Sequence, residues 1–271
     1  MILVLIDALS FQAAHSRMSY MQHLVENRIA ALYQVQTELP TLSRPLYEVI
    51  LTGTKACQNG VTHNFIIRRS HEVSIFELAK SQGLKTAAAA YSWISELYNR
   101  APFEPYNDRE QTDIRANIQY GKFYYDDFYP DSHLFTDGEI LRRRYDPDLL
   151  LIHPMGVDLA GHQNGGESRE YLSKTQDIDN LLADLIPAWL DLDYQIIVTA
   201  DHGMNANGNH GGLESSERIV PLWTLGSCFE PTDSQGLIPQ LGIAPAICKI
   251  LNVDKSARMI DYVFPGFIRS F

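Results

Sequence analysis

Acidic and imidazole side chains follow several short apolar runs of the sequence, where together they could bind metal ions. Asp7 comes directly after such a run, Asp158 lies a few residues beyond another, and Asp201-His202 follow a third, in VTADHGM. If the runs are parallel strands, the loops after them meet at one edge of the sheet, where open α/β folds bind their ligands. The sequence therefore predicts that these acids and imidazoles converge.

Two further histidines extend this set. His162 follows Asp158 by four residues, and His210 lies in GNHGG, eight residues after His202. The flanking glycines let the backbone turn sharply and approach a bound ion. Aspartate oxygen combined with histidine nitrogen, without thiolate, suits zinc or manganese better than calcium or an iron–sulfur cluster. A lone Asp-His-Gly is more often a hydrogen-bonded turn, but the combination predicts a metal site.

Ser43, in TELPTLSRPLYEVILTG, is the candidate nucleophile. Pro45 suits the first turn of a helix that ends near Thr52-Gly53, which puts Ser43 just before the helix. Backbone N–H groups and the helix dipole would then face a phosphate bound at Ser43. The alternative is a serine that only caps the helix. Arg44 could pair with a phosphoryl group through two hydrogen bonds, or be an ordinary surface arginine.

The ordered motifs resemble a known group of enzymes. Asp7, PTLSRP with TG downstream, DLAGH, ADHGM and NHGG together resemble the alkaline phosphatase superfamily, and within it the nucleotide pyrophosphatase/phosphodiesterase branch. Some likeness to ethanolamine-phosphate transferases covers ADHGM to NHGG. The resemblance implies two divalent metal ions, zinc or alternatively manganese: one bound by Asp158, His162 and His210, the other by Asp7, Asp201, His202 and Ser43. Asn64, 21 positions after Ser43, matches an asparagine that holds a phosphate oxygen.

The activity that this resemblance implies is hydrolysis of phosphoric esters through a phosphoserine, with a phosphodiesterase or nucleotide pyrophosphatase as the first choice. A phosphomonoesterase is the alternative, because the branch usually has threonine and an aromatic where this chain has Ser43-Arg44. A sulfatase ranks low, since Tyr47 stands where the sulfatase motif requires arginine. The rival from another class is a non-catalytic phosphate-binding protein, but no ligand position is replaced.

The composition restricts the partners. The formal charge of 22 − 33 = −11 argues against a nucleic acid polymer or an anionic membrane surface, which leaves a small-molecule phosphate ester. The N-terminal MILVLIDALS lacks a basic leader and a cleavage site, so we expect a cytoplasmic chain without a membrane span. Nothing in the sequence indicates the oligomeric state.

The apolar runs also predict the fold, a single α/β domain over residues 1–271 with a largely parallel sheet covered by helices on both faces. Ile178, Leu182 and Ile186 mark the apolar stripe of one helix. Residues 100–144 are crowded with aromatics, which form either a small cap or an excursion packed on the sheet. The expected strands are Ile2–Ile6, Thr86–Ala90, Leu149–Ile152, Gln195–Thr199 and Ile219–Leu225.

Overall fold

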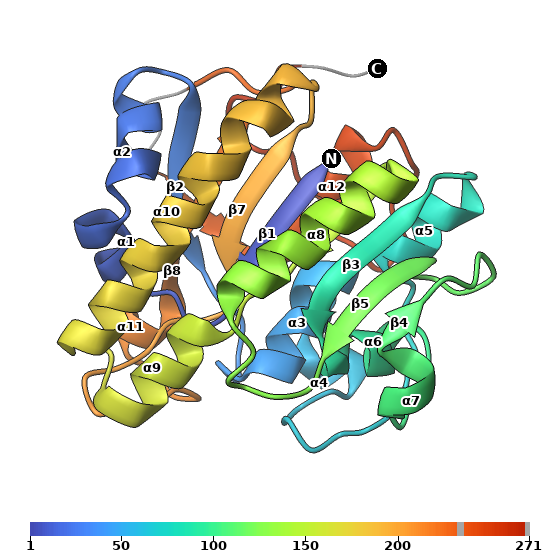
Figure 1. Cartoon of the computed structure of the whole chain (residues 1–271), viewed down its shortest axis with the longest axis horizontal. Coiled ribbons are helices and arrows are strands. Elements are labelled where there is room, and N and C mark those ends of the chain that lie inside the picture. Colours follow the sequence, from blue (N-terminus) through green and yellow to red (C-terminus); the bar gives the residue numbers. More distant parts are fainter. Residues whose placement is uncertain (232–235, 269–271) are drawn as a thin grey trace.

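The computed structural model describes residues 1–231 and 236–268 and contains one central sheet with helices on both faces (Figure 1). Its strands are β1 (Ile2–Ile6), β2 (Ala30–Gln36), β3 (Thr86–Tyr91), β4 (Glu110–Gln111), β5 (Tyr120–Tyr124), β6 (Leu149–Ile152), β7 (Ile196–Ala200), β8 (Ile219–Leu225) and β9 (Leu237–Pro239). Its helices are α1 (Phe11–Arg17), α2 (Ser19–Glu26), α3 (Ser43–Thr52), α4 (Ala56–Asn59), α5 (Ile75–Ser81), α6 (Ser92–Tyr98), α7 (Pro105–Asp108), α8 (Asp131–Tyr145), α9 (Gly156–Asn164), α10 (Arg169–Asp191), α11 (Ser215–Arg218), the 3-10 turn η1 (Gln240–Gly242) and α12 (Ile243–Ile250).

The sheet has the strand order β4-β5-β3-β6-β1-β7-β8-β2-β9. Strands β5, β3, β6, β1 and β7 pair in parallel, whereas β8 runs antiparallel to both β7 and β2, and β4 runs antiparallel to β5. The predicted α/β fold with a largely parallel sheet is thereby confirmed.

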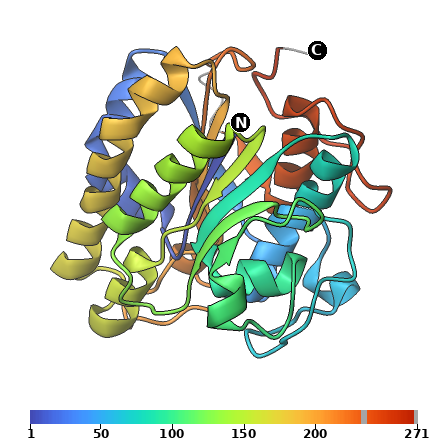
Figure 2. The ribbon, with the colours of Figure 1, turned by 45° about the vertical axis from the view of Figure 1, so that its right-hand side comes forward.

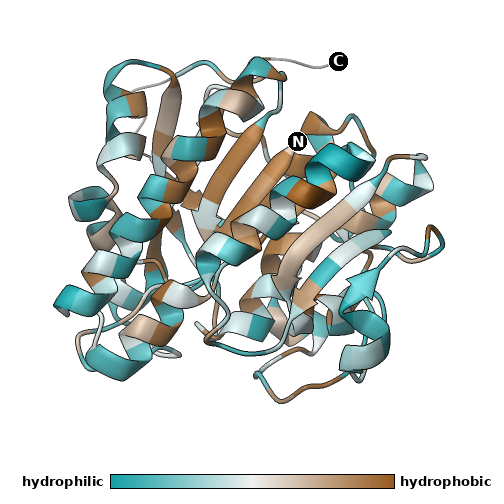
Figure 3. Cartoon of the chain, viewed as in Figure 1, coloured by the Kyte–Doolittle hydropathy of each residue, from teal (hydrophilic) through white to brown (hydrophobic). Residues whose placement is uncertain are grey.

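The central strands form because their sequences are apolar without interruption. All residues of β1, β6 and β7 are buried, as expected for parallel strands with helices on both faces. Figure 3 shows these strands as the hydrophobic centre of the molecule. The sheet therefore carries the main hydrophobic core and fixes where the loops at its carboxyl edge lie.

The helices form two layers, which Figure 2 shows on either side of the sheet. Helices α1, α2, α8 and α10 pack in one layer, and α3, α5, α6 and α12 contact one another in the other. The predicted stripe lies on α10, where Ile178, Leu182 and Ile186 are buried. Ser168 caps this helix by accepting a hydrogen bond from the Tyr171 N–H.

Four of the six residues of strand β3 are alanines, which are weak strand formers. Their small side chains let α8 approach the sheet closely. Gly138 on α8 shows the same constraint, because an added Cβ would lie 2.8 Å from Ile152 Cδ1. The close approach explains why a strand of poor intrinsic propensity is nevertheless buried within the sheet, between β5 and β6.

Residues 100–144, expected to form a cap or an excursion, contribute α7, β4, β5 and most of α8. The segment thus extends the sheet edge and one helical layer. Its aromatics pack on one another and on the core: Tyr124 and Tyr129 stack with centroids 5.1 Å apart. Within residues 1–231 and 236–268, no helix combines the length and apolar character needed to cross a membrane.

Candidate active site

The predicted ligands gather at the carboxyl edge of the sheet in two groups. Asp158 and His162 lie on α9, which follows β6, and His210 comes from the loop after β7. Asp7 directly follows β1, and Asp201 and His202 directly follow β7. The first group is Asp158, His162 and His210; the second is Asp7, Asp201 and His202.

The first group opens toward solvent. His162 Nε2 lies 3.4 Å from Asp158 Oδ1, and His210 Nε2 lies 3.7 Å from the same oxygen. The two Nε2 atoms are 3.1 Å apart. Asp158 is buried, but the His162 side chain is 45% exposed. This group can therefore exchange ligands with bulk solvent.

Backbone carbonyls fix the protonation of all three histidines. His162 Nδ1 lies 2.9 Å from Gly208 O, His210 Nδ1 2.8 Å from Thr41 O, and His202 Nδ1 3.0 Å from Gly203 O. A carbonyl oxygen only accepts hydrogen bonds, so each Nδ1 carries the hydrogen and each Nε2 presents a lone pair. This is the form in which histidine binds metal.

Gly208 shows why glycine is needed at one of these carbonyls. Its φ is +74°, and an added Cβ would lie 2.7 Å from Gly161 O. Glycine adopts this left-handed conformation without a steric penalty and allows the close approach. The carbonyl of Gly208 can then reach His162, whose helix α9 passes directly beside it.

The second group is completely buried. His202 Nε2 lies 3.6 Å from Asp7 Oδ1 and 3.3 Å from Asp201 Oδ2. Ser43 Oγ lies 3.2 Å from the same nitrogen. Because that nitrogen carries a lone pair, the Ser43 hydroxyl can donate to it in this structure. The nucleophile predicted from the sequence is thus within reach of the buried group.

The electrostatics of the second group are those of crowded carboxylates. Burial and the charge of Asp7 raise the pKa of Asp201 well above its usual range. Burial alone would raise the pKa of Asp7. The neighbouring His153 and His202 imidazoles have a larger, opposite effect, so the pKa of Asp7 is lowered to about 2. Burial and His210 lower the pKa of His202 to about 3, so this imidazole is neutral at physiological pH.

These features fit divalent cations. Asp7 Oδ1, Asp158 Oδ1 and Asp201 Oδ2 are buried and lack hydrogen-bond partners among the described residues. Unpaired buried carboxylate oxygens are costly, as are facing imidazole lone pairs, unless a cation lies between them. Mixed carboxylate and imidazole donors suit zinc or manganese. The two groups are therefore candidate cation sites, one solvent-facing and one buried beneath Ser43.

Two residues outside the predicted ligand set hold Asp7. The Tyr47 hydroxyl donates to Asp7 Oδ2, and His153 Nε2 lies 3.4 Å from the same oxygen. His153 Nδ1 accepts from the Tyr91 N–H, so its hydrogen is on Nε2 and faces Asp7. Both groups occupy Oδ2 and leave Oδ1 for a cation. Neither contact follows from a pattern in the sequence, because Tyr47 and His153 lie on separate segments that only the fold brings to Asp7.

Ser43 is the first residue of α3, and Leu42 is the N-cap residue, which makes no side-chain capping bond. The helix therefore begins one residue earlier than expected, and Ser43 does not act as its cap. Gly53 ends the helix in the left-handed conformation, as its position predicted. The start of the helix, with its partial positive charge, lies beside the second group, because Ser43 Oγ is 3.2 Å from His202 Nε2.

Asn64 lies beside the start of this helix. Its Oδ1 accepts a hydrogen bond from the Arg44 N–H at 3.1 Å. The amide NH2 of Asn64 is then the group left to donate to a ligand. Placement beside Ser43 agrees with the predicted contact to a phosphate oxygen, which stays a prediction.

The guanidinium group of Arg44 does not fit its predicted role in binding a phosphoryl group directly. The residue is 1% exposed, and Nη2 lies 2.6 Å from Glu96 Oε2. Nη1 donates to Ile66 O at 3.1 Å, and the group covers the Trp93 ring at 4.6 Å. Arg44 is therefore neither a substrate clamp nor a surface residue. It fastens the segment that carries Asn64 to the start of α3.

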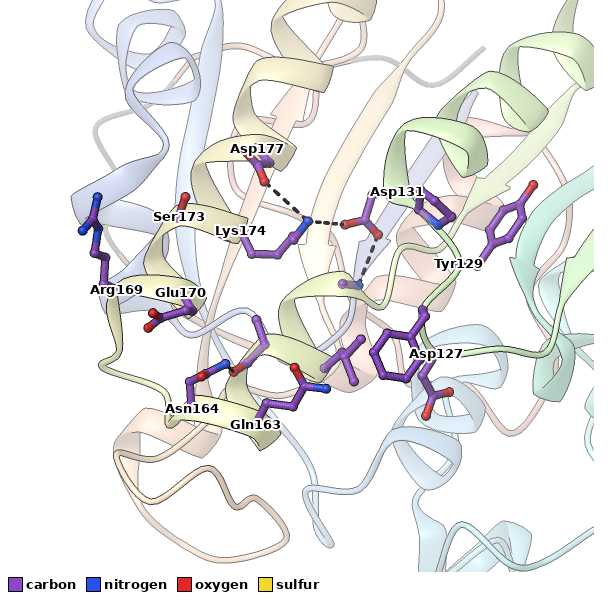
Figure 4. A pocket seen from close by; sticks show the side chains of 15 residues that line it. Asp127, Tyr129, Asp131, Gln163, Asn164, Arg169, Glu170, Ser173, Lys174 and Asp177 are labelled. Atoms are coloured by element: carbon purple, nitrogen blue, oxygen red, sulfur yellow. Dashed lines mark hydrogen bonds and ion pairs between the residues drawn. The ribbon is translucent and has the colours of Figure 1, made fainter.

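A crevice of about 650 Å³ borders the site between the start of α8, α9 and α10 (Figure 4). Lys174 Nζ lies 4.0 Å from Asp131 Oδ2 and 3.4 Å from Asp177 Oδ2, so its charge is neutralised locally. Asp127 lines the crevice. The pKa of Asp158 is raised well above its usual range, first by burial, then by the charge of Asp7 and then by that of Asp127. The crevice is lined by residues of α9, the helix that carries Asp158 and His162, but neither of these two side chains lines it.

A layered α/β fold with this pair of acid and histidine groups defines an alkaline phosphatase-like domain. The family model for type I phosphodiesterase / nucleotide pyrophosphatase matches residues 1–225. The chain therefore belongs to this family, whose members act on phosphoric esters, and the resemblance stated from the motifs is confirmed.

Curated relatives include human GPI ethanolamine phosphate transferase 3, catalytic subunit, 26% identical over 93% of this chain and 24% of the relative. GPI ethanolamine phosphate transferase 2 from Candida glabrata is 22% identical over 100% of this chain and 36% of the relative. The chain thus spans about a quarter to a third of the length of these relatives.

Solved structures share the fold. Murine ectonucleotide pyrophosphatase / phosphodiesterase 5 aligns with a TM-score of 0.75 and 13% identity, over 94% of this chain and 96% of that one. Phosphonate monoester hydrolase from Silicibacter pomeroyi aligns with a TM-score of 0.66 and 12% identity, over 93% and 72%. At these identities the likeness concerns the fold alone.

Proposed function

We propose that this chain is a metal-dependent phosphodiesterase that forms a covalent ester on Ser43. The observation that carries the proposal is the pair of histidine lone pairs, on His162 and His210, 3.1 Å apart beside an unpaired carboxylate oxygen of Asp158. A divalent cation bound between these atoms would stabilise the arrangement. The family match supports phosphoric ester chemistry at this centre.

Two divalent ions, zinc or manganese, would neutralise the carboxylates, lower the pKa of the serine hydroxyl and stabilise charge on the phosphoryl oxygens. Asp158, His162 and His210 would hold one ion, and Asp7, Asp201, His202 and Ser43 Oγ the other. Tyr47 and His153 keep Asp7 oriented so that Oδ1 remains available.

Ser43 Oγ is the attacking atom. Its bond to phosphorus forms as the bond to the leaving alkoxide breaks; the Ser43 hydroxyl gives up its proton to solvent, and the alkoxide takes up a proton from solvent to leave as the alcohol. The Asn64 NH2 group and the start of α3 stabilise the non-bridging oxygens, which carry more charge in the transition state. Water then attacks phosphorus, releases the phosphate product and restores the Ser43 hydroxyl.

The substrate we propose is a small phosphodiester, because the reassigned Arg44 no longer supplies a fixed charge for a dianionic monoester. Phosphomonoester hydrolysis remains the alternative from the same chemistry. Sulfatase activity still ranks low among the alternatives. Tyr47 occupies the position of the arginine that the sulfatase motif requires, and its hydroxyl donates a hydrogen bond to Asp7.

A second candidate is transfer of the phosphoryl group to an acceptor alcohol in place of water. The crevice beside Asp158 offers room for an acceptor, and several curated relatives are named ethanolamine phosphate transferases. In that case the acceptor hydroxyl attacks the Ser43 ester, and a new phosphodiester forms.

The test is turnover of bis-aryl phosphate, alkyl aryl phosphate and aryl phosphate after metal removal, with zinc or manganese added back. The proposal expects metal-dependent cleavage with higher kcat/KM for the diesters and none with Ser43→Ala. Activity that survives chelation would contradict it. Product analysis with an added primary alcohol distinguishes hydrolysis from transfer, because a transferase forms the new ester.

A further inference from the structure

Thr41 joins the segment that carries the candidate nucleophile to the loop that carries His210. The residue lies two positions before Ser43 and is buried. Its carbonyl oxygen accepts a hydrogen bond from His210 Nδ1 at 2.8 Å. Its hydroxyl Oγ1 accepts from the Gly211 N–H at 2.8 Å and donates to Gly212 O at 3.1 Å. Three hydrogen bonds therefore link this one residue to three consecutive positions of the loop.

The hydroxyl of Thr41 both donates and accepts in these contacts. Its single hydrogen goes to Gly212 O, because a carbonyl oxygen only accepts, and a lone pair takes the Gly211 N–H. Gly211 has a φ of +105°, and an added Cβ would lie 3.3 Å from Leu42 Cδ2. The loop thus also lies against Leu42, the residue between Thr41 and Ser43. An apolar side chain of the same shape at position 41 would keep this packing and lose both hydroxyl bonds.

Glu217, on α11, holds the same loop from another side. This buried carboxylate accepts from the Gly212 N–H at 2.6 Å and from Asn205 Nδ2 at 2.7 Å, and its backbone carbonyl accepts from the Gly203 N–H at 2.8 Å. Asn205 Oδ1 accepts from the backbone N–H groups of positions 207 and 209, at 3.0 Å each. The loop is therefore shaped by contacts of its own. What the Thr41 hydroxyl adds is the position of the loop relative to the start of α3.

We propose that the Thr41 hydroxyl is a positioning group that keeps His210 in register with Ser43. His210 belongs to the first group of acids and histidines, whereas Ser43 Oγ lies 3.2 Å from His202 Nε2 in the second. The His210 and His202 rings also stack, with centroids 3.9 Å apart. By fixing His210 against the segment of Ser43, the hydroxyl sets the relative position of the two groups.

This role rests on the proposed function, in which Ser43 Oγ attacks a phosphoryl group held between the two groups. Misplacement by about 1 Å can lower a rate by about 10²-fold. Removal of a group that orients a metal-ligating histidine typically lowers metal affinity or activity by about 10- to 100-fold. Loss of the Thr41 hydroxyl should therefore change both the zinc affinity of the first group and the rate of the chemical step.

The test substitutes Thr41→Val, which preserves the shape of the side chain and the carbonyl that binds His210 but removes the hydroxyl. Zinc affinity, measured by competition with a chromophoric chelator, should fall by about 10- to 100-fold at one of two sites. At saturating zinc, kcat for a soluble aryl phosphodiester should fall at least about tenfold, with KM changed by less than about threefold. Thr41→Ser keeps the hydroxyl and should restore both quantities.

The matched control is Thr37→Val. Thr37 is 1% exposed and lies in the same segment between β2 and α3, but its hydroxyl has no hydrogen-bond partner among the described residues. This control should bind zinc and turn over the ester like the wild type. Urea unfolding of the metal-free proteins checks that each is folded. If Thr41→Val does not fold, Thr41→Cys takes its place beside Thr41→Ser, because a thiol is only a weak donor.

Thr41→Val in a His210→Ala background should change the remaining zinc affinity by less than about twofold, because both substitutions act at one site. Equal loss with and without His210, or equal loss in Thr37→Val, would overturn the positioning role. Lower zinc affinity with wild-type kcat at saturating zinc would overturn the register with Ser43.

The same measurements separate this role from the proposed function. A wild type that cleaves the ester while Thr41→Val keeps its zinc affinity and its kcat overturns the positioning role alone. A wild type that binds zinc without cleaving the ester overturns the proposed function alone, and the zinc affinity of Thr41→Val then decides whether the hydroxyl holds His210.

Discussion

Arg44 should govern catalysis without touching the substrate, because it connects Glu96, Ile66 and the start of α3. Arg44→Ala would leave the Glu96 carboxylate buried with the Phe103 N–H as its remaining hydrogen-bond donor. Breaking one side of a buried ion pair costs about 3–5 kcal/mol. Single domains are stable by about 5–15 kcal/mol, so this variant would be marginal and its activity difficult to interpret.

The informative perturbation is therefore Arg44→Met combined with Glu96→Gln. It removes both charges, and methionine fills much of the space along Trp93, so stability should stay within about 2 kcal/mol of the wild type. The hydrogen bond to Ile66 O is lost, however, and the Asn64 loop loosens. One oxyanion donor is worth about 10²–10³ in kcat, so partial misplacement of Asn64 should lower kcat/KM by about ten- to hundredfold.

Urea unfolding measures the stability, and steady-state kinetics on a soluble aryl phosphodiester measures the activity. The same double change in an Asn64→Ala background should alter kcat/KM by only about twofold, because both act through one group. Wild-type kcat/KM in the Arg44→Met/Glu96→Gln protein would refute the positioning role. An equal fold loss with and without Asn64 would refute it as well.

Three further predictions concern other residues. Ser43→Ala should lower turnover by at least about 10³-fold while plasma emission still counts about two ions per chain; near-native turnover would exclude the covalent step. Asp201→Asn keeps the oxygen that accepts from the Ala8 N–H but loses Oδ2, so the ion count should fall toward one and kcat by about 10²-fold or more; two retained ions would contradict the assignment. Burial raises the pKa of Glu48 from 4.5 to about 6 against the hydrogen bonds from Ser70 and Tyr98, so the folded state binds more protons between these pH values. The stability of the wild type relative to Glu48→Gln should therefore fall by about 2 kcal/mol as pH rises from 4 to 7; a pH-independent difference in urea unfolding would show that Glu48 does not titrate in this way.

The sequence was informative where one local pattern determines one structural outcome. Uninterrupted apolar runs predicted β1, β6 and β7, and because Asp7 and Asp201 follow such runs directly, their convergence followed from the topology. The helix at Ser43 was predicted to within one residue from Pro45 and Gly53. The predictions for these parts required no knowledge of distant contacts.

Other features depend on contacts between distant residues. Strand β2 alternates between buried and half-buried positions beside antiparallel β8, and no strand was expected there. The direction of the Arg44 side chain is set by Glu96, 52 positions away, and by Trp93. The orientation of Asp7 depends on Tyr47 and His153, which only the folded sheet brings together. Sequence spacing carries no signal for such choices.

The central claim is that the two groups of acids and histidines bind two divalent ions beside Ser43. Anomalous diffraction from crystals grown with zinc tests it most directly. We expect one peak among Asp158, His162 and His210 and a second among Asp7, Asp201 and His202, with Ser43 Oγ beside the second. Absence of both peaks in a folded, zinc-saturated crystal, or zinc bound only elsewhere, would contradict it.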